Sequence, residues 1–453
     1  MQNSKRTTRR QFLKSAGAVT AAIGLPAIVP SAVLGSVAIA PNDKINVGLI
    51  GCGPQGNQVL GNFLSAPDCR VVAVCDLWQK AMQAAANRVE NHYKNGTPAI
   101  ESSCRAYGDF RELLASDDID AVLIAVPDHW HALLGLAAAR AGKDMYLEKP
   151  LGVSVTEDLT LQTAIHNSRR VFQFGTQQRS DRNFRLACEM ARNGLIGELK
   201  EINVWCYGSY EQEKGRPTPV PDDFDYDTWT GPAQFKPYIR TRCQGPNPHL
   251  KTWWFDSTYS VGWIAGWGVH PLDIALWGAG DLARTRVEVE GSARFPNDGE
   301  CDTATTWDVV FEYASGLRIN FKTNPPPAEW QSRYGKAFDH GTAFEGSEGW
   351  VLVDREGLYT SSAHLVDWRP RASDRRLYES PEHVRNFLDC VRTRRETICS
   401  IEQAVQVDIL CHLADIATRL ARRVAWDPVK ERFINDEQAN RMLARSMRSG
   451  WHL

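Results

Sequence analysis

Residues 44–64 have the sequence KINVGLIGCGPQGNQVLGNFL. Its apolar run Ile45–Ile50 is followed by a glycine loop, Gly51-Cys52-Gly53-Pro54-Gln55-Gly56, and then by apolar residues at helical spacing. Gly51 permits a tight turn, Gly53 lets the backbone approach a pyrophosphate, and Gly56 allows close packing of helix on strand. The start of the helix then faces the phosphate charge. The stretch therefore predicts a dinucleotide-binding strand–loop–helix unit.

A second apolar strand, RVVAVCD, ends in Asp76. A carboxylate at that place accepts hydrogen bonds from the adenosine ribose and repels a 2′-phosphate. NAD is therefore the expected cofactor, and NADP is the alternative because Lys80 lies nearby. The residues expected to hold the nucleotide on this side are Gly51, Gly53, Pro54, Gln55, Gly56 and Asp76.

The next segments continue the alternation of strand and helix. DIDAVLIAVP (residues 118–127) reads as a strand, ALLGLAAARAGK (132–143) as a helix and DMYLEKPLGVSV (144–155) as a strand and loop. This order predicts an α/β chain with an N-terminal Rossmann domain, a doubly wound parallel sheet, over residues 43–178. Ligands bind such sheets at the C-terminal ends of the strands.

The N-terminus has the pattern of an export signal. TTRRQFLK, residues 7–14, contains paired arginines followed by Phe-Leu and Lys, and a weakly apolar stretch of small residues comes next. This pattern predicts a twin-arginine signal over residues 1–40, a mature chain that starts near Pro41, and a periplasmic or otherwise exported protein. The alternative is an amphipathic N-terminal helix. The twin-arginine machinery, a predicted partner, carries proteins that are already folded.

Composition excludes several classes of function. The 453 residues have a net charge of −2, and the sequence contains no basic stripe of the kind that binds nucleic acid. No run beyond the signal is apolar enough to span a bilayer. The 11 cysteines are scattered without CxxC or Cys/His clusters, which predicts buried thiols, no disulfide framework and no metal site.

Four motifs carry a resemblance to a known family. They are PDHWH (127–131), Glu148-Lys149-Pro150, FQFGTQQR (172–179) and the segment around His270. With the glycine loop and Asp76, they resemble the family of glucose–fructose oxidoreductase and inositol 2-dehydrogenase, Gfo/Idh/MocA. The resemblance covers nearly all of the chain after residue 43, and the C-terminal segments resemble an exported, twin-arginine subgroup.

The resemblance implies a C-terminal α+β domain, residues 179–453, with a large open and mainly antiparallel sheet that covers the nicotinamide and often mediates homo-oligomers. The residues agree, because five segments rich in β-formers follow residue 198. A long helix at 400–423 has apolar residues at spacings of three and four.

The family transfers hydride between a sugar-like carbinol and the nicotinamide, which needs an acid/base and a donor that stabilises the alkoxide. By resemblance, Lys149 is the lysine beside the reacting oxygen and His270 the acid/base. Pro127, His131, Glu148, Lys149 and Gln177 are expected to line the nicotinamide side of the site.

The chain departs from the family at Gly266, which stands where an acidic residue normally precedes the histidine. Asp273, one turn after His270, either orients the histidine, binds a substrate hydroxyl, or makes only a helix-stabilising hydrogen bond. Gln177, Gln178 and Arg179 follow the strand VFQFG and are expected at the mouth of the cleft. His249 and Trp263 are candidates for an aromatic sugar platform.

The sequence predicts an exported NAD(P)-dependent oxidoreductase acting on a sugar or polyol, with the cofactor kept bound because free NAD is unreliable outside the cytoplasm. The alternative is an NAD-dependent glycoside hydrolase or lyase with a redox-neutral cycle of oxidation, elimination and return of hydride. A third reading is a non-catalytic sugar-binding protein on the same fold.

Overall fold

The first sheet consists of six parallel strands in the order β3-β2-β1-β4-β5-β6. The computed structural model describes residues 43–96, 103–244, 252–335 and 339–453. The strands are β1 (Ile45–Ile50), β2 (Cys69–Cys75), β3 (Arg105–Tyr107), β4 (Ala121–Ile124), β5 (Asp144–Leu147) and β6 (Phe172–Phe174). Apart from the edge strand β3, the strands are almost continuously buried, which is typical of a parallel sheet covered on both faces. The predicted Rossmann sheet is confirmed.

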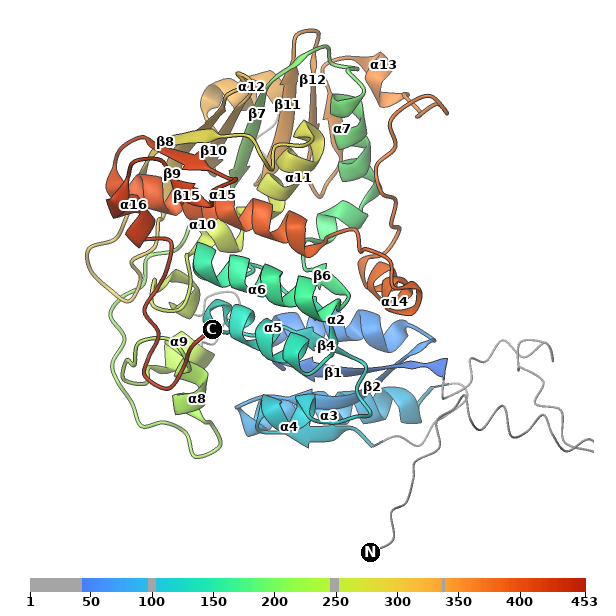
Figure 1. The fold of residues 1–453 in the computed structure, drawn as a ribbon, viewed down its shortest axis with the longest axis vertical. Helices are drawn as coiled ribbons and strands as arrows, with labels where there is room; N and C mark the ends of the chain where they lie inside the picture. The colour runs from blue at the N-terminus through green and yellow to red at the C-terminus, as the bar shows by residue number, and fades with distance from the viewer. Residues whose placement is uncertain (1–42, 97–102, 245–251, 336–338) are drawn as a thin grey trace, which may run out of the picture. The chain divides into compact units, whose positions relative to one another are not determined.

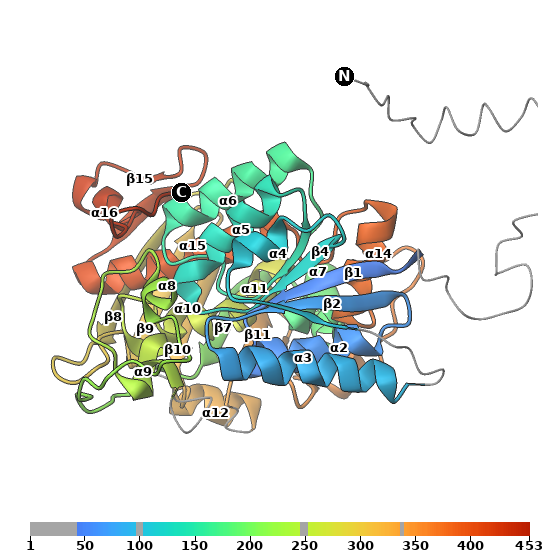
Figure 2. The same cartoon turned by 90° about the horizontal axis from the view of Figure 1, so that it is seen from below.

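Helices cover both faces of this sheet (Figure 2). One face carries α2 (Pro54–Ser65) and α3 (Gln79–Lys94), and the other carries α4 (Phe110–Leu114), α5 (His131–Arg140) and α6 (Val155–Ser168). Helix α2 begins with proline in its first turn, where the missing N–H costs no hydrogen bond. Its start therefore lies directly after the glycine loop, as the sequence predicts.

The second sheet has nine strands in the order β13-β12-β11-β7-β10-β9-β8-β14-β15. Only the β7–β10 pair is parallel among these neighbours, so the predicted mainly antiparallel sheet is confirmed. The strands are β7 (Leu199–Cys206), β8 (Val287–Arg294), β9 (Thr306–Tyr313), β10 (Arg318–Thr323), β11 (Gly341–Gly346), β12 (Trp350–Val353), β13 (Leu358–Thr360), β14 (Val424–Asp427) and β15 (Arg432–Phe433).

Of the remaining helices, two of the longer ones pack on the second sheet (Figure 1). Helix α11 (Val269–Ala279) contacts β7 and β11, and the long α15 (Ile401–Leu420) contacts both β8 and α6. The others are α7 (Arg182–Arg192), α8 (Tyr226–Thr230), α9 (Arg240–Gln244), α10 (Trp263–Gly266), α12 (Ala328–Tyr334), α13 (Ala363–Val366), α14 (His383–Thr393) and α16 (Glu437–Arg441). Among the described residues, no helix has the length and apolar character that a membrane crossing requires.

Helix α14 belongs to the core of the first domain, although the predicted boundary at 178/179 assigns it to the second. Phe387 lies edge-on to Phe63 and Tyr146, with ring centroids 6.1 Å apart in both pairs. Arg385 and Arg392 both pair with Asp68, which precedes β2. These contacts join residues more than 200 positions apart in the chain, so no local sequence pattern indicates which sheet the helix covers.

The segment between β7 and α10 packs against the end of β2, beside Asp76. Trp78 donates through its indole nitrogen to Asp223 over 3.1 Å, and Phe224 pairs with Trp78 in an isolated β-bridge. A cluster of aromatic rings including Tyr226, Trp229 and Tyr259 buries this contact. The segment therefore forms one wall of the nucleotide end of the cleft.

All 11 cysteines are free and buried, which confirms the interpretation of scattered core thiols. None of them lies in a disulfide, so the fold forms without oxidation.

Candidate active site

A cavity of about 980 Å³ runs from the glycine loop to His270, along the C-terminal ends of the parallel strands. Its walls include most of the predicted site residues. Those that line it are Gly51, Gly53, Pro54, Gln55, Asp76, Pro127, His131, Glu148, Lys149, Gln177, Trp263 and His270.

The glycine loop fits a dinucleotide. Gly51 has φ +98°, and a Cβ there would lie 2.2 Å from the carbonyl oxygen of Ala125. A Cβ on Gly56 would lie 2.0 Å from the carbonyl oxygen of Gly51, so both positions exclude side chains. A Cβ on Gly53 meets nothing within 4 Å, which leaves the approach to the start of α2 open for a pyrophosphate.

Asp76 is held beside that loop. Its carboxylate accepts from the backbone N–H of Cys52 at 2.7 Å and of Trp78 at 2.8 Å, while the residue also lines the cavity. Lys80, the reason to consider NADP, pairs instead with Asp223 over 3.4 Å. Lys80 is therefore directed toward Asp223 rather than toward a 2′-phosphate beside Asp76, which favours NAD.

Glu148 joins three chain segments at the nicotinamide end. Its Oε1 accepts from the side-chain amides of Gln55 and Gln177, each at 3.0 Å. Its Oε2 is buried and has no hydrogen-bond partner among the described residues. Burial raises the pKa of Glu148. A free acceptor at this place suits a ligand hydroxyl or amide group.

His131 is a buried part of the wall rather than an exposed ligand. One ring nitrogen lies 2.9 Å from the carbonyl oxygen of Val126, and the other faces the carbonyl oxygen of Pro150 at short range. Burial lowers the pKa of His131 to about 4. The imidazole therefore ties the end of β4 to the loop that follows Lys149.

Lys149 follows Glu148 at the end of β5. Its Nζ donates to the carbonyl oxygen of Gly266 over 2.9 Å. No ion pair of Lys149 occurs among the described residues. The ammonium group is therefore fixed by a neutral acceptor and keeps its charge available to a ligand in the cavity.

His270, near the start of α11, is 5% exposed. Burial first, and then the positive charges of Lys149 and Arg355, lower its pKa well below the ordinary value. Its Nδ1 is buried without a hydrogen-bond partner in the described part of the chain. The ring packs edge-on against Trp267, with centroids 5.6 Å apart. At neutral pH this imidazole is an uncharged base, oriented by packing rather than by a carboxylate.

Gly266 has a role through its backbone, which holds Lys149. A Cβ there would meet only Cδ1 of Trp263, at an ordinary 3.5 Å. The backbone therefore does not require glycine, and the missing side chain adds space to the cavity wall. That space is available to a substrate.

We expect Gly266→Ala to fold normally and to weaken substrate binding, because the methyl group extends into the cavity. Stability should rise by about 0.5–1 kcal/mol, the usual gain for alanine over glycine in a helix. Thermal unfolding and KM measure the two effects. Gly268→Ala is the matched control, because a Cβ there would lie 2.2 Å from the carbonyl oxygen of Ile264 and should destabilise the fold. An unstable Gly266→Ala variant would contradict the open geometry.

Arg179 and Asp273 differ from their predictions. They bind each other through two hydrogen bonds of 2.8 and 2.6 Å, with side chains only 4% and 2% exposed. Neither lies on the cavity wall as the described residues form it. Arg179 is therefore buried instead of lying at the mouth of the cleft, and both carboxylate oxygens of Asp273 bind Arg179. A carboxylate and a guanidinium this deep are stable only as a pair.

Two further residues line this end of the cavity, of which Gln178 was expected there and Arg355 was not predicted. Arg355, in the turn between β12 and β13, lies over the ring of Trp267 at 4.8 Å. The side-chain amide of Gln178 lies between Arg355 and His270. In the orientation that satisfies both of its ends, its nitrogen donates to the His270 carbonyl oxygen at 3.2 Å and its oxygen accepts from Arg355 Nε at 3.3 Å.

Aromatic rings surround the polar groups. Trp253 and Trp254 lie 5.1 Å apart, and Trp254 lies 6.3 Å from Trp263. All three line the cavity, as the sugar-platform prediction requires. His249, predicted beside them, falls outside the described residues.

Comparison with known proteins gives three family matches. Residues 45–176 match the NAD-binding Rossmann fold of the Gfo/Idh/MocA oxidoreductase family, and residues 200–453 match its C-terminal alpha/beta domain. Residues 6–26 match the twin-arginine translocation signal, which indicates export by that pathway.

Two curated relatives come from Shewanella. Glycosyl hydrolase family 109 protein 1 of strain MR-4 is 30% identical over 204 residues, which is 42% of this chain and 44% of the relative. An alpha-N-acetylgalactosaminidase of Shewanella oneidensis is 31% identical over 204 residues, with the same shares of 42% and 44%. The match thus spans less than half the length of these proteins.

Solved structures share the fold. The WlbA dehydrogenase of Chromobacterium violaceum, in complex with NADH and UDP-GlcNAcA, is 18% identical with a TM-score of 0.61, over 85% of this chain and 96% of that one. A levoglucosan dehydrogenase in complex with NADH is 17% identical with a TM-score of 0.60, over 84% of this chain and 99% of that one.

Proposed function

The chain is a member of the Gfo/Idh/MocA oxidoreductase family, and from that membership we propose an exported enzyme that transfers hydride between a sugar or polyol hydroxyl and a retained NAD. One observation carries the proposal. Lys149 and His270 line the same cavity as the nucleotide loop, and Lys149 is bound to the backbone of Gly266, one turn before the histidine.

Lys149 and His270 have different roles toward the substrate hydroxyl. His270 is neutral at neutral pH because burial and two nearby cations disfavour its charged form, so it accepts the hydroxyl proton. The Lys149 ammonium stabilises the negative charge that develops on the substrate oxygen. NAD, held by the glycine loop, Asp76 and the free Glu148 oxygen, supplies the hydride acceptor.

Retention of the nucleotide follows from export and from the walls of the cleft. A cofactor released outside the cytoplasm would be lost, so the enzyme must recycle it while bound. The segment between β7 and α10, with its cluster of aromatic rings, packs beside Trp78 at the end of the cleft where the nucleotide is expected. A second substrate that accepts the hydride would restore the oxidised cofactor.

We expect purified full-length protein to carry about one nicotinamide nucleotide per chain, as a tightly held cofactor requires. Mass spectrometry of the released nucleotide identifies it as NAD or NADP. Adding sugars, polyols and uronates one at a time should change the nicotinamide absorbance for at least one compound. Asp76→Ala should lose nucleotide, whereas Lys80→Ala, altered at an exposed residue, should keep it. Nucleotide-free protein, or sugar binding without any spectral change, would contradict the proposal.

The redox-neutral glycosidase is the second candidate, because curated relatives are named glycosyl hydrolases of family 109. The same residues serve such a cycle, since oxidation of one hydroxyl acidifies the neighbouring C–H bond for elimination. A panel of nitrophenyl glycosides distinguishes the two. Release of nitrophenol without net NADH supports the glycosidase, and stoichiometric reduction of the bound cofactor supports the oxidoreductase.

The pH dependence should report the buried imidazole. Because burial first, and then the charges of Lys149 and Arg355, lower the pKa of His270, kcat/KM should stay level as pH falls through 6.5 and decline only in more acidic buffer. Arg355→Gln removes one of these charges, raises the pKa of His270 and should shift the acidic limb to higher pH. Arg371→Gln, altered at an exposed arginine, is the control. An unchanged limb in Arg355→Gln would show that another group titrates.

Assembly through the second sheet stays a prediction. Its outer face carries Arg423 in ion pairs with Glu288, Glu290 and Glu312 near one end.

A further inference from the structure

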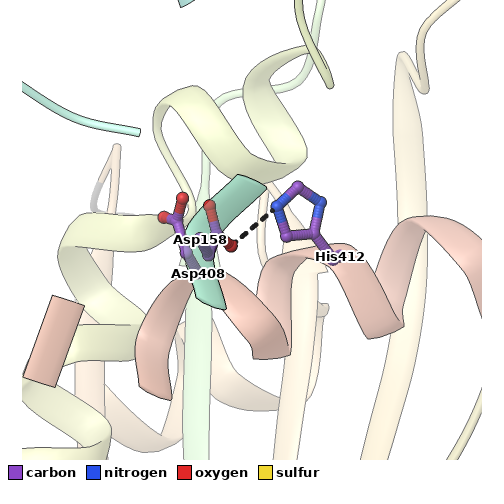
Figure 3. Close-up of side chains that lie close together, drawn as sticks. All are labelled: Asp158, Asp408 and His412. Atoms are coloured by element: carbon purple, nitrogen blue, oxygen red, sulfur yellow. Dashed lines mark ion pairs between the residues drawn. The ribbon is translucent and has the colours of Figure 1, made fainter. Parts of the chain in front are cut away.

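A second polar cluster lies outside the cavity, between the two domains' helices. Asp158 comes from α6, and Asp408 and His412 come from successive turns of α15 (Figure 3). Each offers one ligand atom, and these atoms all lie within 4.8 Å of one another. The residues are 0%, 0% and 5% exposed. None of the three lines the nucleotide cavity.

The ligand atoms of this cluster are buried and make no hydrogen bond among the described residues, and the one contact between them is an ion pair within the cluster itself. In the described part of the chain, both carboxylate oxygens of Asp158, Oδ1 of Asp408 and Nε2 of His412 make no hydrogen bond. The second oxygen of Asp408 is occupied, because it accepts from the backbone N–H of Leu151 at 2.6 Å. His412 Nε2 lies 3.1 Å from Asp158 Oδ2, as the dashed line in Figure 3 marks.

Among the described residues, no arginine forms an ion pair with Asp158 or Asp408, although Arg445 lies near enough to act on the charge of Glu157. Arg419 is engaged with Asp415 at 2.8 Å, and Arg445 donates to the backbone oxygen of Ser257. Glu157, beside Asp158, adds another buried carboxylate, which accepts from the Val153 N–H. An unpaired buried carboxylate costs several kcal/mol, so two of them call for a cation.

We propose that Asp158, Asp408 and His412 bind a divalent first-row metal ion, with Zn²⁺ favoured. Zn²⁺ binds imidazole nitrogen at about 2.0–2.1 Å and carboxylate oxygen at about 2.0–2.2 Å, and zinc sites in proteins combine histidine with carboxylate ligands. Two such ligands near a right angle lie roughly 3 Å apart, as the His412 and Asp158 atoms do. The second oxygen of Asp158 supplies a fourth donor.

The ion has a structural role. It joins α6 to α15, and Asp408 holds the backbone of Leu151 and Gly152, two and three residues after Lys149. Pro150 in the same loop binds His131. Loading must precede burial, so the ion enters while the chain folds in the cytoplasm, before twin-arginine export. The inference is independent of the proposed hydride transfer.

The test is elemental analysis of full-length protein from cells supplied with Zn²⁺ and Mn²⁺. The wild type should contain about one ion per chain, and Asp158→Asn with His412→Gln should lower that ratio at least about tenfold. Asp415→Asn on the same helix and His166→Gln at an exposed histidine should keep the metal. The proposal would be overturned if the wild type contained no metal, or if the double variant contained as much metal as the wild type. Protons shared among the three side chains would then neutralise the buried carboxylates.

Refolding with Co²⁺ gives a second measurement if the double variant fails to fold. The wild type should show the visible absorption of Co²⁺ in a site of nitrogen and oxygen ligands. His412→Cys, which keeps a metal ligand, should add an intense thiolate-to-cobalt band. A spectrum identical to that of free Co²⁺ in both proteins would overturn the proposal.

Discussion

Replacing Lys149 by alanine should lower the rate of hydride transfer about 10²–10³-fold, the usual loss when one preorganised donor to a developing oxyanion is removed. Lys149 Nζ is the only lysine nitrogen that lines the described cavity wall. The nucleotide should stay bound, because the glycine loop, Asp76 and Glu148 are unchanged. Single-turnover spectra of the bound cofactor measure the rate, and mass spectrometry of the released nucleotide measures its content.

Two controls separate catalysis from folding in this experiment. Lys149→Met keeps most of the side-chain volume and should lose the same rate, since it lacks the charge. Lys80→Ala changes an exposed lysine near the nucleotide end and should leave the rate unaltered. Unchanged turnover in Lys149→Ala would refute the assignment, and loss of nucleotide would show that Lys149 mainly binds the cofactor.

The second large effect concerns stability. Asp273→Ala should lower the free energy of unfolding by about 3–5 kcal/mol, because it leaves the Arg179 guanidinium buried without its partner. The two side chains are 4% and 2% exposed and share two hydrogen bonds. Denaturant unfolding monitored by tryptophan fluorescence measures the loss.

The double variant Arg179→Met with Asp273→Leu is the decisive companion. A hydrophobic pair of similar volume should recover most of the lost stability, since no charge stays unpaired. If Asp273 has no contact with His270, kcat/KM of the double variant should decline on the acidic side at the same pH as that of the wild type. A shifted limb in a stable double variant would restore Asp273 as the residue that orients the histidine.

Much of the fold could be predicted because its signals are local. The glycine loop, the strand before it and Asp76 lie within one strand–helix–strand unit, and their spacing alone limits the geometry. Strands β7 to β10 follow from alternation and β-branched residues. β11, β14 and β15 were missed, because β15 is two residues long and β14 four.

The partners of buried polar groups could not be predicted. Asp273 lies one turn after His270, yet α11 is buried on nearly all sides, so neighbouring faces meet different elements. Arg179 reaches it from a segment 94 residues away. Arg355 approaches from the edge hairpin of the second sheet, and its turn sequence resembles any solvated turn.

The prediction of no metal site differs from the inferred site for the same reason. That prediction rested on the absence of Cys/His clusters, whereas Asp158 lies some 250 residues before Asp408 and His412. Only the spacing of Asp408 and His412, four residues apart on a predicted helix, was a local signal.

The return of α14 to the first domain has a consequence for biosynthesis. Phe387 covers Phe63 and Tyr146, so the nucleotide-binding half stays incomplete on the ribosome until almost the whole chain has been made. Its exposed aromatic surface then depends on chaperones during translation, and expression of residues 43–178 alone should give insoluble protein. The order of synthesis thereby delays nucleotide capture until the polypeptide is nearly finished, when export of a complete, loaded enzyme can begin.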